Sequence, residues 1–243
     1  YELGATEART ETTLPGPAAT LTVVAATLLN DQVSPADREK LIRDRGQSAA
    51  DLITAMAQGL GPDSKEEYRR IPWLWRVAFP AGRSDDAAVL RQLLDAALPA
   101  PGDALYHWQA VVLGGGVING LSQVRTNPGE RLSQLLKESA PLRARWDRSL
   151  ALAVTMATEA QVPAGTRYDA LRMIALLPWA TARPLLEVHL ASEAHPELQQ
   201  GAVSGLLDSP EAAAAQLILE HWPKFTPANQ KLALTGLLRT DPG

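Results

Sequence analysis

The stretch RYDALRMIALLP (residues 167–178) decides the fold, because its apolar residues recur at helical spacing. Met173, Leu176 and Leu177 fall at positions i, i+3 and i+4, which is one face of a helix. The same spacing recurs in two later trios, thirty and then thirty-one residues on: Val203, Leu206, Leu207 and Leu234, Leu237, Leu238. A proline follows each trio within a few residues: Pro178, Pro210 and Pro242. A helix, a tight turn and a second helix at a period slightly above 30 residues are typical of an α-solenoid.

The regular period predicts the domain organisation. One helical pair cannot cover its own apolar face, so neighbouring pairs stack and bury a continuous core. We therefore predict an all-α, right-handed α-α superhelix of HEAT-like (HEAT/armadillo-like) helical pairs over residues 18–243. Residues 18–160 form irregular units, residues 163–243 form regular units of about 30 residues, and the last unit is truncated. Residues 1–17 are predicted to be a linker or the tail of a preceding domain.

Local signals place several helix boundaries. Ser34-Pro35 predicts a helix start, with the serine as N-cap and the proline in the first turn. Ser84-Asp85-Asp86 predicts a cap for a helix that runs to about Leu98. In IPWLWRV (71–77), Pro72 is expected to open an aromatic helix, with residues 61–70 as a connector or a short helix.

Composition excludes several classes of function. The 243 residues are 46% hydrophobic but poor in aromatic and β-branched residues, which favours helices. A net charge of −4 offers no overall attraction for nucleic acid or an acidic membrane face. Since the chain has no cysteine, it contains no disulfide, no thiolate nucleophile and no covalent haem attachment. No apolar run approaches the roughly 20 residues of a membrane helix, so no membrane insertion by this segment is expected.

The run WQAVVLGGGVING (108–120) raises the possibility of a nucleotide site. The dinucleotide fingerprint needs GxGxxG after a strand, but Asn119 stands where the third glycine is needed and Gly120 comes one residue late. A phosphate-binding loop from Gly115 to Gly120 lacks its lysine, because Leu121 occupies that position. Residues 103–113 continue well as a helix. We therefore favour Gly114, Gly115, Gly116 and Gly120 as small residues that let helices approach closely, with the nucleotide-binding enzyme as the alternative.

Other candidate residues point to packing or to a partner. The histidines show no metal-ligand spacing, so no metal site, catalytic residue or cofactor-binding residue is assigned. Two arginine clusters, Arg69, Arg70, Arg76 and Arg143, Arg145, Arg148, are expected to form a solvated face with local ion pairs. A nucleic-acid-binding stripe is their alternative. Trp73, Trp75 and Trp108 are candidate core residues or anchors for a partner.

Four phrases resemble a known family: IPWLWRVAFPAG (71–82), HWQAVVLGGGVINGL (107–121), RYDALRMIALLPW (167–179) and HPELQQGAVSGLLD (195–208). They are similar to the helical-repeat region of large planctomycete and verrucomicrobial membrane-bound dehydrogenases that carry a C-terminal c-type cytochrome domain. The resemblance implies a β-propeller before this region, a haem domain with CxxCH after it, and export of the whole protein to the periplasm. No haem ligand or catalytic residue transfers to this chain, since it has no CxxCH.

Together these observations predict a non-catalytic scaffold or protein-interaction module. Its expected partners are a protein or the neighbouring domains of the same chain, with no nucleic acid. Any haem is expected only in the C-terminal domain of the suspected larger protein, and this segment is expected to hold no cofactor.

Overall fold

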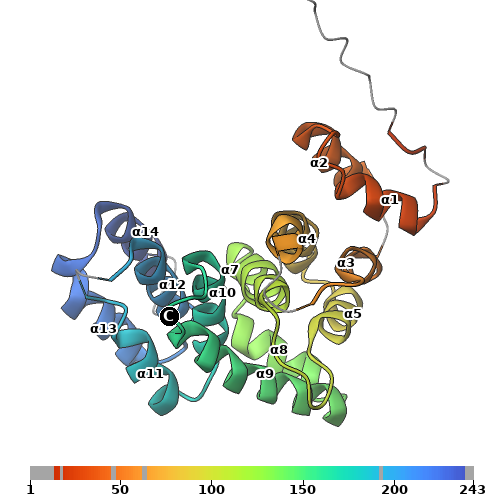
Figure 1. Cartoon of the computed structure of the whole chain (residues 1–243). Coiled ribbons are helices and arrows are strands. Elements are labelled where there is room, and N and C mark those ends of the chain that lie inside the picture. The colour runs from red at the N-terminus through yellow and green to blue at the C-terminus, as the bar shows by residue number, and fades with distance from the viewer. Residues whose placement is uncertain (1–13, 17–18, 45–47, 62–64, 192–193, 239–243) are drawn as a thin grey trace, which may run out of the picture.

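The computed structural model describes residues 14–16, 19–44, 48–61, 65–191 and 194–238. Within these ranges every regular element is a helix and there is no strand (Figure 1). The predicted all-α class is therefore confirmed. Most of the predicted linker over residues 1–17 lies outside the described residues, as does Pro242 of the repeat pattern.

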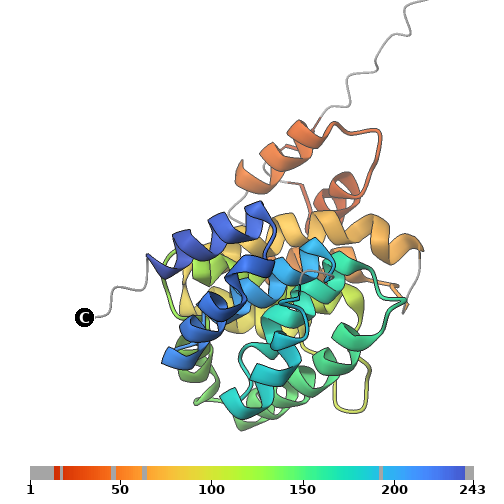
Figure 2. The same cartoon turned by 90° about the vertical axis from the view of Figure 1, so that its left-hand side faces the viewer.

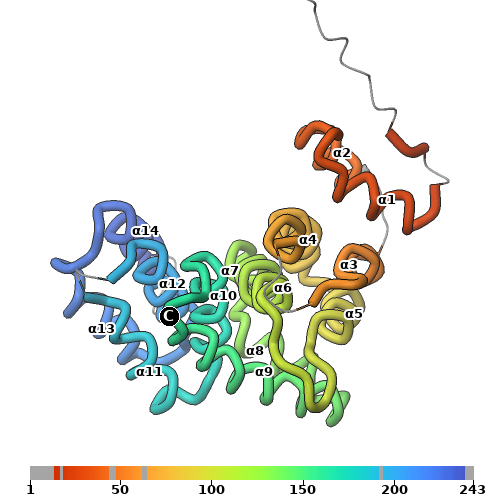
Figure 3. The backbone as a smooth tube through the Cα atoms, viewed as in Figure 1, coloured from red at the N-terminus to blue at the C-terminus, as the bar shows by residue number. Residues whose placement is uncertain are grey.

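From Lys65 onward the helices form two rows (Figures 1 and 3). In the first row each helix packs on the next. Its members are α4 (Lys65–Ser84), the continuous helix α6–η1–α7 (His107–Ala110, Val111–Ile118, Asn119–Gln123), α10 (Ala164–Ile174), α12 (Pro196–Leu207) and α14 (Pro227–Leu237). The second row contains α5 (Ala87–Ala97), α8 (Pro128–Leu136), α9 (Ala140–Thr158), α11 (Trp179–Glu187) and α13 (Ala212–His221), with the short 3₁₀ turn η2 (Trp222–Lys224) before α14. Figure 2 shows the same stack after a 90° turn. The right-handed superhelix of HEAT-like pairs stays a prediction.

Three further helices precede the two rows. These are α1 (Leu21–Leu28), α2 (Pro35–Asp44) and α3 (Ala49–Ala57). Helix α3 packs on both α4 and α5, and α1 packs on α3, so the apolar core continues into this region. The start of α2 at Pro35 is confirmed, and the Ser34 hydroxyl accepts a hydrogen bond from the main-chain N–H of Asp37 at 3.1 Å.

The repeated apolar spacing falls on equivalent helices of the first row, although Leu176 and Leu177 lie just beyond the end of α10 at Ile174. Met173 in α10 and Val203 in α12 are fully buried, because each of these helices has a neighbour on both sides in its row. In α14 the equivalent residue Leu234 is 51% exposed, and Leu238 just beyond the helix is 77% exposed. No described helix covers that side of α14. Leu234 and Leu238 therefore have the same spacing as their counterparts at α10 and α12 but are exposed.

Helix α4 begins seven residues earlier than the sequence suggests. It starts at Lys65 rather than at Pro72, so the expected connector over residues 61–70 is helical from Lys65 onward. An interior proline costs a helix about 3 kcal/mol. Burial outweighs that cost, because one face of α4 buries Trp73, Leu74 and Val77 while Pro72 points to solvent.

A buried glutamine joins three elements at one end of the stack. The side chain of Gln199 in α12 is 1% exposed. Its amide nitrogen donates to the carbonyls of Ala191 (3.0 Å) and Lys224 (3.1 Å). Its oxygen accepts from the Thr226 main-chain N–H and from the Asn229 side chain, both at 2.9 Å. All four hydrogen-bonding positions of the amide are used, so Gln199 fixes the start of α14 against α12.

Candidate functional site

The glycine run lies inside a helix. Residues Val111–Ile118 form a π-helical segment between α6 and α7, in which the Asn119 N–H bonds to the carbonyl of Gly114, five residues earlier. Gly114, Gly115 and Gly116 are buried, and no strand precedes them among residues 65–191. The expected helix over 103–113 begins only at His107, because the Gln109 side chain accepts the Tyr106 N–H (2.8 Å) and caps the helix there.

The glycines bring three helices into backbone contact. A β-carbon on Gly114 would overlap the main-chain carbonyl of Asp169 in α10. One on Gly116 would overlap Ala78 in α4, and one on Gly120 would lie 2.8 Å from the main-chain atoms of Gly82. The close approach of helices that the sequence favours is what the structure contains at these positions.

The three candidate tryptophans make internal contacts. Trp73 is 7% exposed, and the guanidinium groups of Arg38 and Arg76 lie 4.0 and 4.8 Å from its ring centroid. The indole N–H of Trp75 donates to the Gly115 carbonyl at 3.0 Å. Trp108 is 8% exposed and lies in the core. Trp75 and Gly115 are thus brought together, whereas Asn119 lies apart from the tryptophans and lines a cavity.

The histidines do not converge. His107 hydrogen-bonds through Nδ1 with the Tyr68 hydroxyl at 2.6 Å, and His195 accepts the Glu197 N–H at the start of α12. In the described part of the chain, no three His, Asp or Glu side chains lie close enough together to hold a metal ion.

The arginine clusters form local ion pairs, as expected: Arg69 and Arg70 with Glu66, and Arg143 with Asp147. Several of these arginines also donate to main-chain carbonyls, which the sequence did not suggest. Arg145 in α9 donates to the carbonyls of Asp95 (2.8 Å), Leu98 (2.5 Å) and Pro99 (3.2 Å) at the end of α5. The same arrangement recurs elsewhere, with the acceptor carbonyl in parentheses: Arg69 (Leu29), Arg70 (Met56, Gln58), Arg131 (Asp85), Arg148 (Ala100, Asp103) and Arg167 (Ala157). Carbonyls at a helix C-terminus carry partial negative charge, and most of these acceptors lie there, so the arginines join their own helix to the end of another one.

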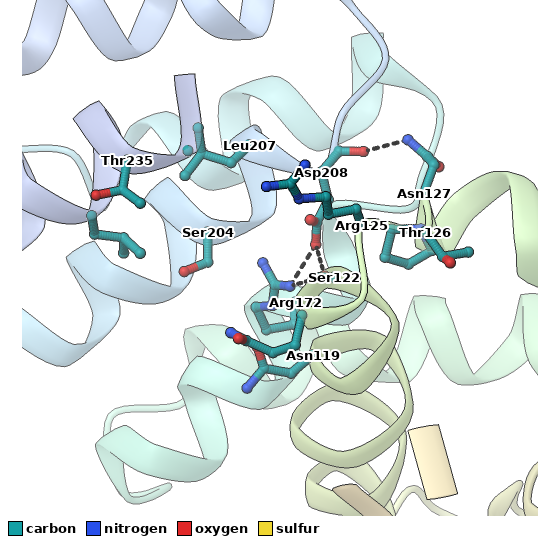
Figure 4. A pocket seen from close by; sticks show the side chains of 14 residues that line it. Asn119, Ser122, Arg125, Thr126, Asn127, Arg172, Ser204, Leu207, Asp208 and Thr235 are labelled. Atoms are coloured by element: carbon teal, nitrogen blue, oxygen red, sulfur yellow. Dashed lines mark hydrogen bonds and ion pairs between the residues drawn. The ribbon is translucent and has the colours of Figure 1, made fainter. Parts of the chain in front are cut away.

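A polar cavity of about 290 Å³ lies between α7, α10, α12 and α14 (Figure 4). We call it the Arg172 pocket, after the arginine in its wall. Arg172 is 1% exposed, and its Nη2 donates to the Asp208 carboxylate (2.5 Å) and to the Ser122 hydroxyl (2.8 Å). Ser122 also donates to Asp208 at 2.8 Å. The three side chains come from α10, from the residue after α12 and from α7, so they bring three helices together at one point.

Burial dominates the electrostatics around Arg172. It raises the pKa of the Asp208 carboxyl above its usual range, although the charge of Arg172 and the hydrogen bonds from Ser122 and Arg172 oppose the shift. Asp169, one turn before Arg172, is fully enclosed, and burial raises its pKa well above the usual range despite the nearby arginine.

These residues were not among the candidates from sequence. The available signal is Arg172 itself, a charged residue within the apolar run Leu171–Ile174. Its partners lie 36 and 50 residues away and stand in no motif, so only the packing of α7, α10 and α12 brings them together.

A second, larger cavity of about 710 Å³ opens beside the first. We call it the Trp146–Trp179 groove. It runs between α8 and α9 on one side and the α10–α11 and α12–α13 turns on the other. Its apolar lining is Leu132, Leu136, Trp146, Leu150, Ala175, Leu176, Leu177, Pro178, Trp179 and Pro210. Asn127 and Asp208 line both cavities.

The edge of the groove is acidic. Arg143 and Asp147 form an ion pair at 2.9 Å and neutralise each other. The two other edge carboxylates, Glu130 and Glu211, are exposed and have no ion pair with another described residue. The groove therefore combines a floor of tryptophan and leucine with a polar, negatively charged edge, a composition found at protein–protein interfaces.

None of the described helices combines the length and the apolar character needed to span a bilayer. Comparison of the chain with protein-family models, with curated proteins and with solved structures gives no match.

Proposed function

We infer that this chain is a non-catalytic helical-repeat scaffold, and that the Trp146–Trp179 groove is where it binds a segment of a protein partner. In this proposal the helices form a right-handed superhelix of HEAT-like pairs. The stacking of pairs is supported by the recurrence of the apolar spacing at α10, α12 and α14 and by the packing of each first-row helix on the next.

The groove is the observation that carries the binding role. Trp179, Leu176 and Leu177 are only partly buried and line the same cavity as Trp146, which is 5% exposed and belongs to the core beneath them. Large aromatic side chains beside aliphatic ones are the residues that contribute most to protein–protein binding energy. A peptide side chain inserted here displaces water from apolar surface and needs few hydrogen bonds.

The charge of the edge specifies the partner further. Because Glu130 and Glu211 are unpaired within the described residues, the partner segment carries lysine or arginine on either side of its apolar anchor. Such a segment satisfies both carboxylates without burying a charge.

The family resemblance adds a setting to this proposal. In that setting the chain is the middle, spacer segment of a larger exported protein with a c-type cytochrome domain, and its partners include the neighbouring domains. The support for this part is the four sequence phrases alone, and the genomic sequence on either side of this chain tests it directly.

The groove is tested with a display library of random twelve-residue peptides selected on the immobilised chain. We expect enrichment of an apolar residue flanked by lysine or arginine. In fluorescence anisotropy with a selected peptide, Trp179→Ala should weaken binding at least about tenfold. The double substitution Glu130→Gln and Glu211→Gln should weaken it severalfold and reduce its salt dependence.

Two matched controls lie outside the groove. Leu219→Ala removes an apolar side chain that is 59% exposed on α13, and Glu159→Gln removes an exposed carboxylate after α9. Neither should alter the affinity. Peptides whose binding survives Trp179→Ala would show that the groove is not the binding site. A selection without basic residues would show that Glu130 and Glu211 do not specify the partner.

A further inference from the structure

The Arg172 pocket contains a buried guanidinium with unused donors. Nη2 of Arg172 makes both of its hydrogen bonds, whereas Nε and Nη1 are buried without a hydrogen-bond partner. In Figure 4 the end of Arg172 that carries no dashed line points away from Asp208, towards the side of the pocket where Ser204 lies. A buried donor without a partner is costly, and most such groups in proteins are satisfied.

The charge in the pocket is positive. Asp208 neutralises one arginine, but a second arginine, Arg125, lines the pocket and forms no ion pair with any described residue. Arg125 is the second residue after α7 and has a φ of +61°. Asp208 is the only carboxylate among the lining residues, and its ion pair with Arg172 is already formed. An anion that enters from solvent therefore meets two guanidinium groups and a single carboxylate, that of Asp208, which is paired with Arg172.

The rest of the pocket wall is uncharged and suits the organic part of a ligand. Neutral hydrogen-bonding side chains of Asn119, Ser204 and Thr235 line the pocket, and Leu207 and Leu232 provide an apolar patch. A volume of about 290 Å³ is at the lower end of the range for small-molecule sites. It is too small for a folded segment but large enough for a metabolite.

We propose that the Arg172 pocket binds a small organic anion, whose carboxylate or phosphate oxygens accept hydrogen bonds from Nη1 of Arg172 and from Arg125. The apolar part of this ligand lies against Leu207 and Leu232. The proposal is independent of peptide binding in the Trp146–Trp179 groove, since neither arginine contributes to that cavity.

The test measures the thermal unfolding midpoint with separate anions at equal ionic strength, with sodium chloride as reference. The probes are sodium benzoate and sodium succinate as organic carboxylates, glycerol 3-phosphate as an organic phosphate, and inorganic phosphate. We expect at least one organic anion to raise Tm by about 3 °C at roughly ten times its Kd. Titration calorimetry of that anion gives its affinity.

Two substitutions at exposed positions keep the test separate from folding, because Arg172→Met would leave Asp208 buried without its partner. Arg125→Gln should weaken binding roughly fivefold. Thr235→Trp should abolish binding by filling the pocket, since Thr235 is exposed at its edge. Arg183→Gln, which removes an exposed arginine paired with Glu187 outside the pocket, should bind like the wild type.

Each outcome decides the proposal. No organic anion exceeding chloride, or unchanged affinity in both Arg125→Gln and Thr235→Trp, overturns it. Equal affinity for inorganic phosphate and glycerol 3-phosphate overturns the organic part, because the apolar wall then contributes nothing. Peptide binding in the Trp146–Trp179 groove should be unchanged in Arg125→Gln. A failure of the anion-binding proposal can therefore be distinguished from a failure of the scaffold proposal.

Discussion

The α-carbon of Gly114 faces the main-chain carbonyl of Asp169 so closely that no β-carbon fits between them. This contact joins the glycine helix to α10, and the Gly116–Ala78 and Gly120–Gly82 contacts join it to α4 on its other side. The middle of the first row is therefore held by backbone packed on backbone, which explains why a glycine run occurs inside a buried helix.

Gly114→Ala should lower the free energy of unfolding by about 3 kcal/mol or more, because the added methyl group can be accommodated only by moving α10. Urea unfolding followed by circular dichroism measures the change. The control is Gly165→Ala in the first turn of α10, where the nearest atom to an added β-carbon is the mobile end of Glu197 at 3.3 Å. This change should be neutral or slightly stabilising. Equal tolerance of both substitutions would refute the packing argument.

Arg145→Met should cost about 2 kcal/mol of stability, since it leaves the carbonyls at the end of α5 without their donor in addition to breaking the ion pair with Asp95. Arg143→Met on the same helix breaks only an exposed ion pair with Asp147 and should cost less than about 0.5 kcal/mol. Chemical denaturation of the two variants compares them directly. If Arg143→Met were the more harmful change, the joining role of Arg145 would be wrong.

Asp169→Asn should make the chain more stable at neutral pH. Burial raises the pKa of Asp169 in the folded state, so the folded protein holds a proton that the unfolded chain has lost above about pH 4. Stability therefore falls as pH rises from there through the raised pKa, and the asparagine variant avoids this loss. Thermal unfolding from pH 3 to 8 should show a difference that grows with pH. Glu159→Gln, at an exposed position, should show none.

Gln199→Leu should cost about 3 kcal/mol or more, because it removes all four hydrogen bonds and leaves buried groups unpaired at Thr226 and Asn229. Its neighbour Gln200 is exposed, and Gln200→Leu provides the matched control with little expected effect. Hydrogen exchange should show faster opening of α14 in Gln199→Leu only. Protection of α14 that equals the wild type would contradict the proposed tether.

The helical class and several boundaries were predictable because local chemistry sets them. The spacing around Met173 and Val203 places apolar residues on one face, and both are buried. Asp86 accepts from the N–H groups of Ala88 and Val89 and caps α5 as predicted. The start of α4 was missed because the burial of the face that includes Trp73 outweighs the local signal of Pro72.

The cavities were not predictable, because they depend on contacts between helices far apart in the chain. Arg172 meets Ser122 and Asp208 only through the stacking of α7, α10 and α12. Nor does the sequence indicate that Arg145 donates hydrogen bonds to main-chain carbonyls. Every residue has such a carbonyl, so the sequence does not distinguish the ones that accept. Patterns along one chain report which face is apolar, whereas a site between helices requires their relative placement.

The contacts of the glycine helix also restrict how this chain can change over evolutionary time. Where a glycine faces a side chain, as Gly236 faces Leu207, a larger residue on one side can be offset by a smaller one opposite. Gly114 and Gly120 face main-chain atoms, for which no smaller replacement exists. A genetic screen for second-site suppressors should therefore rescue substitutions at Gly236 and none at Gly114 or Gly120.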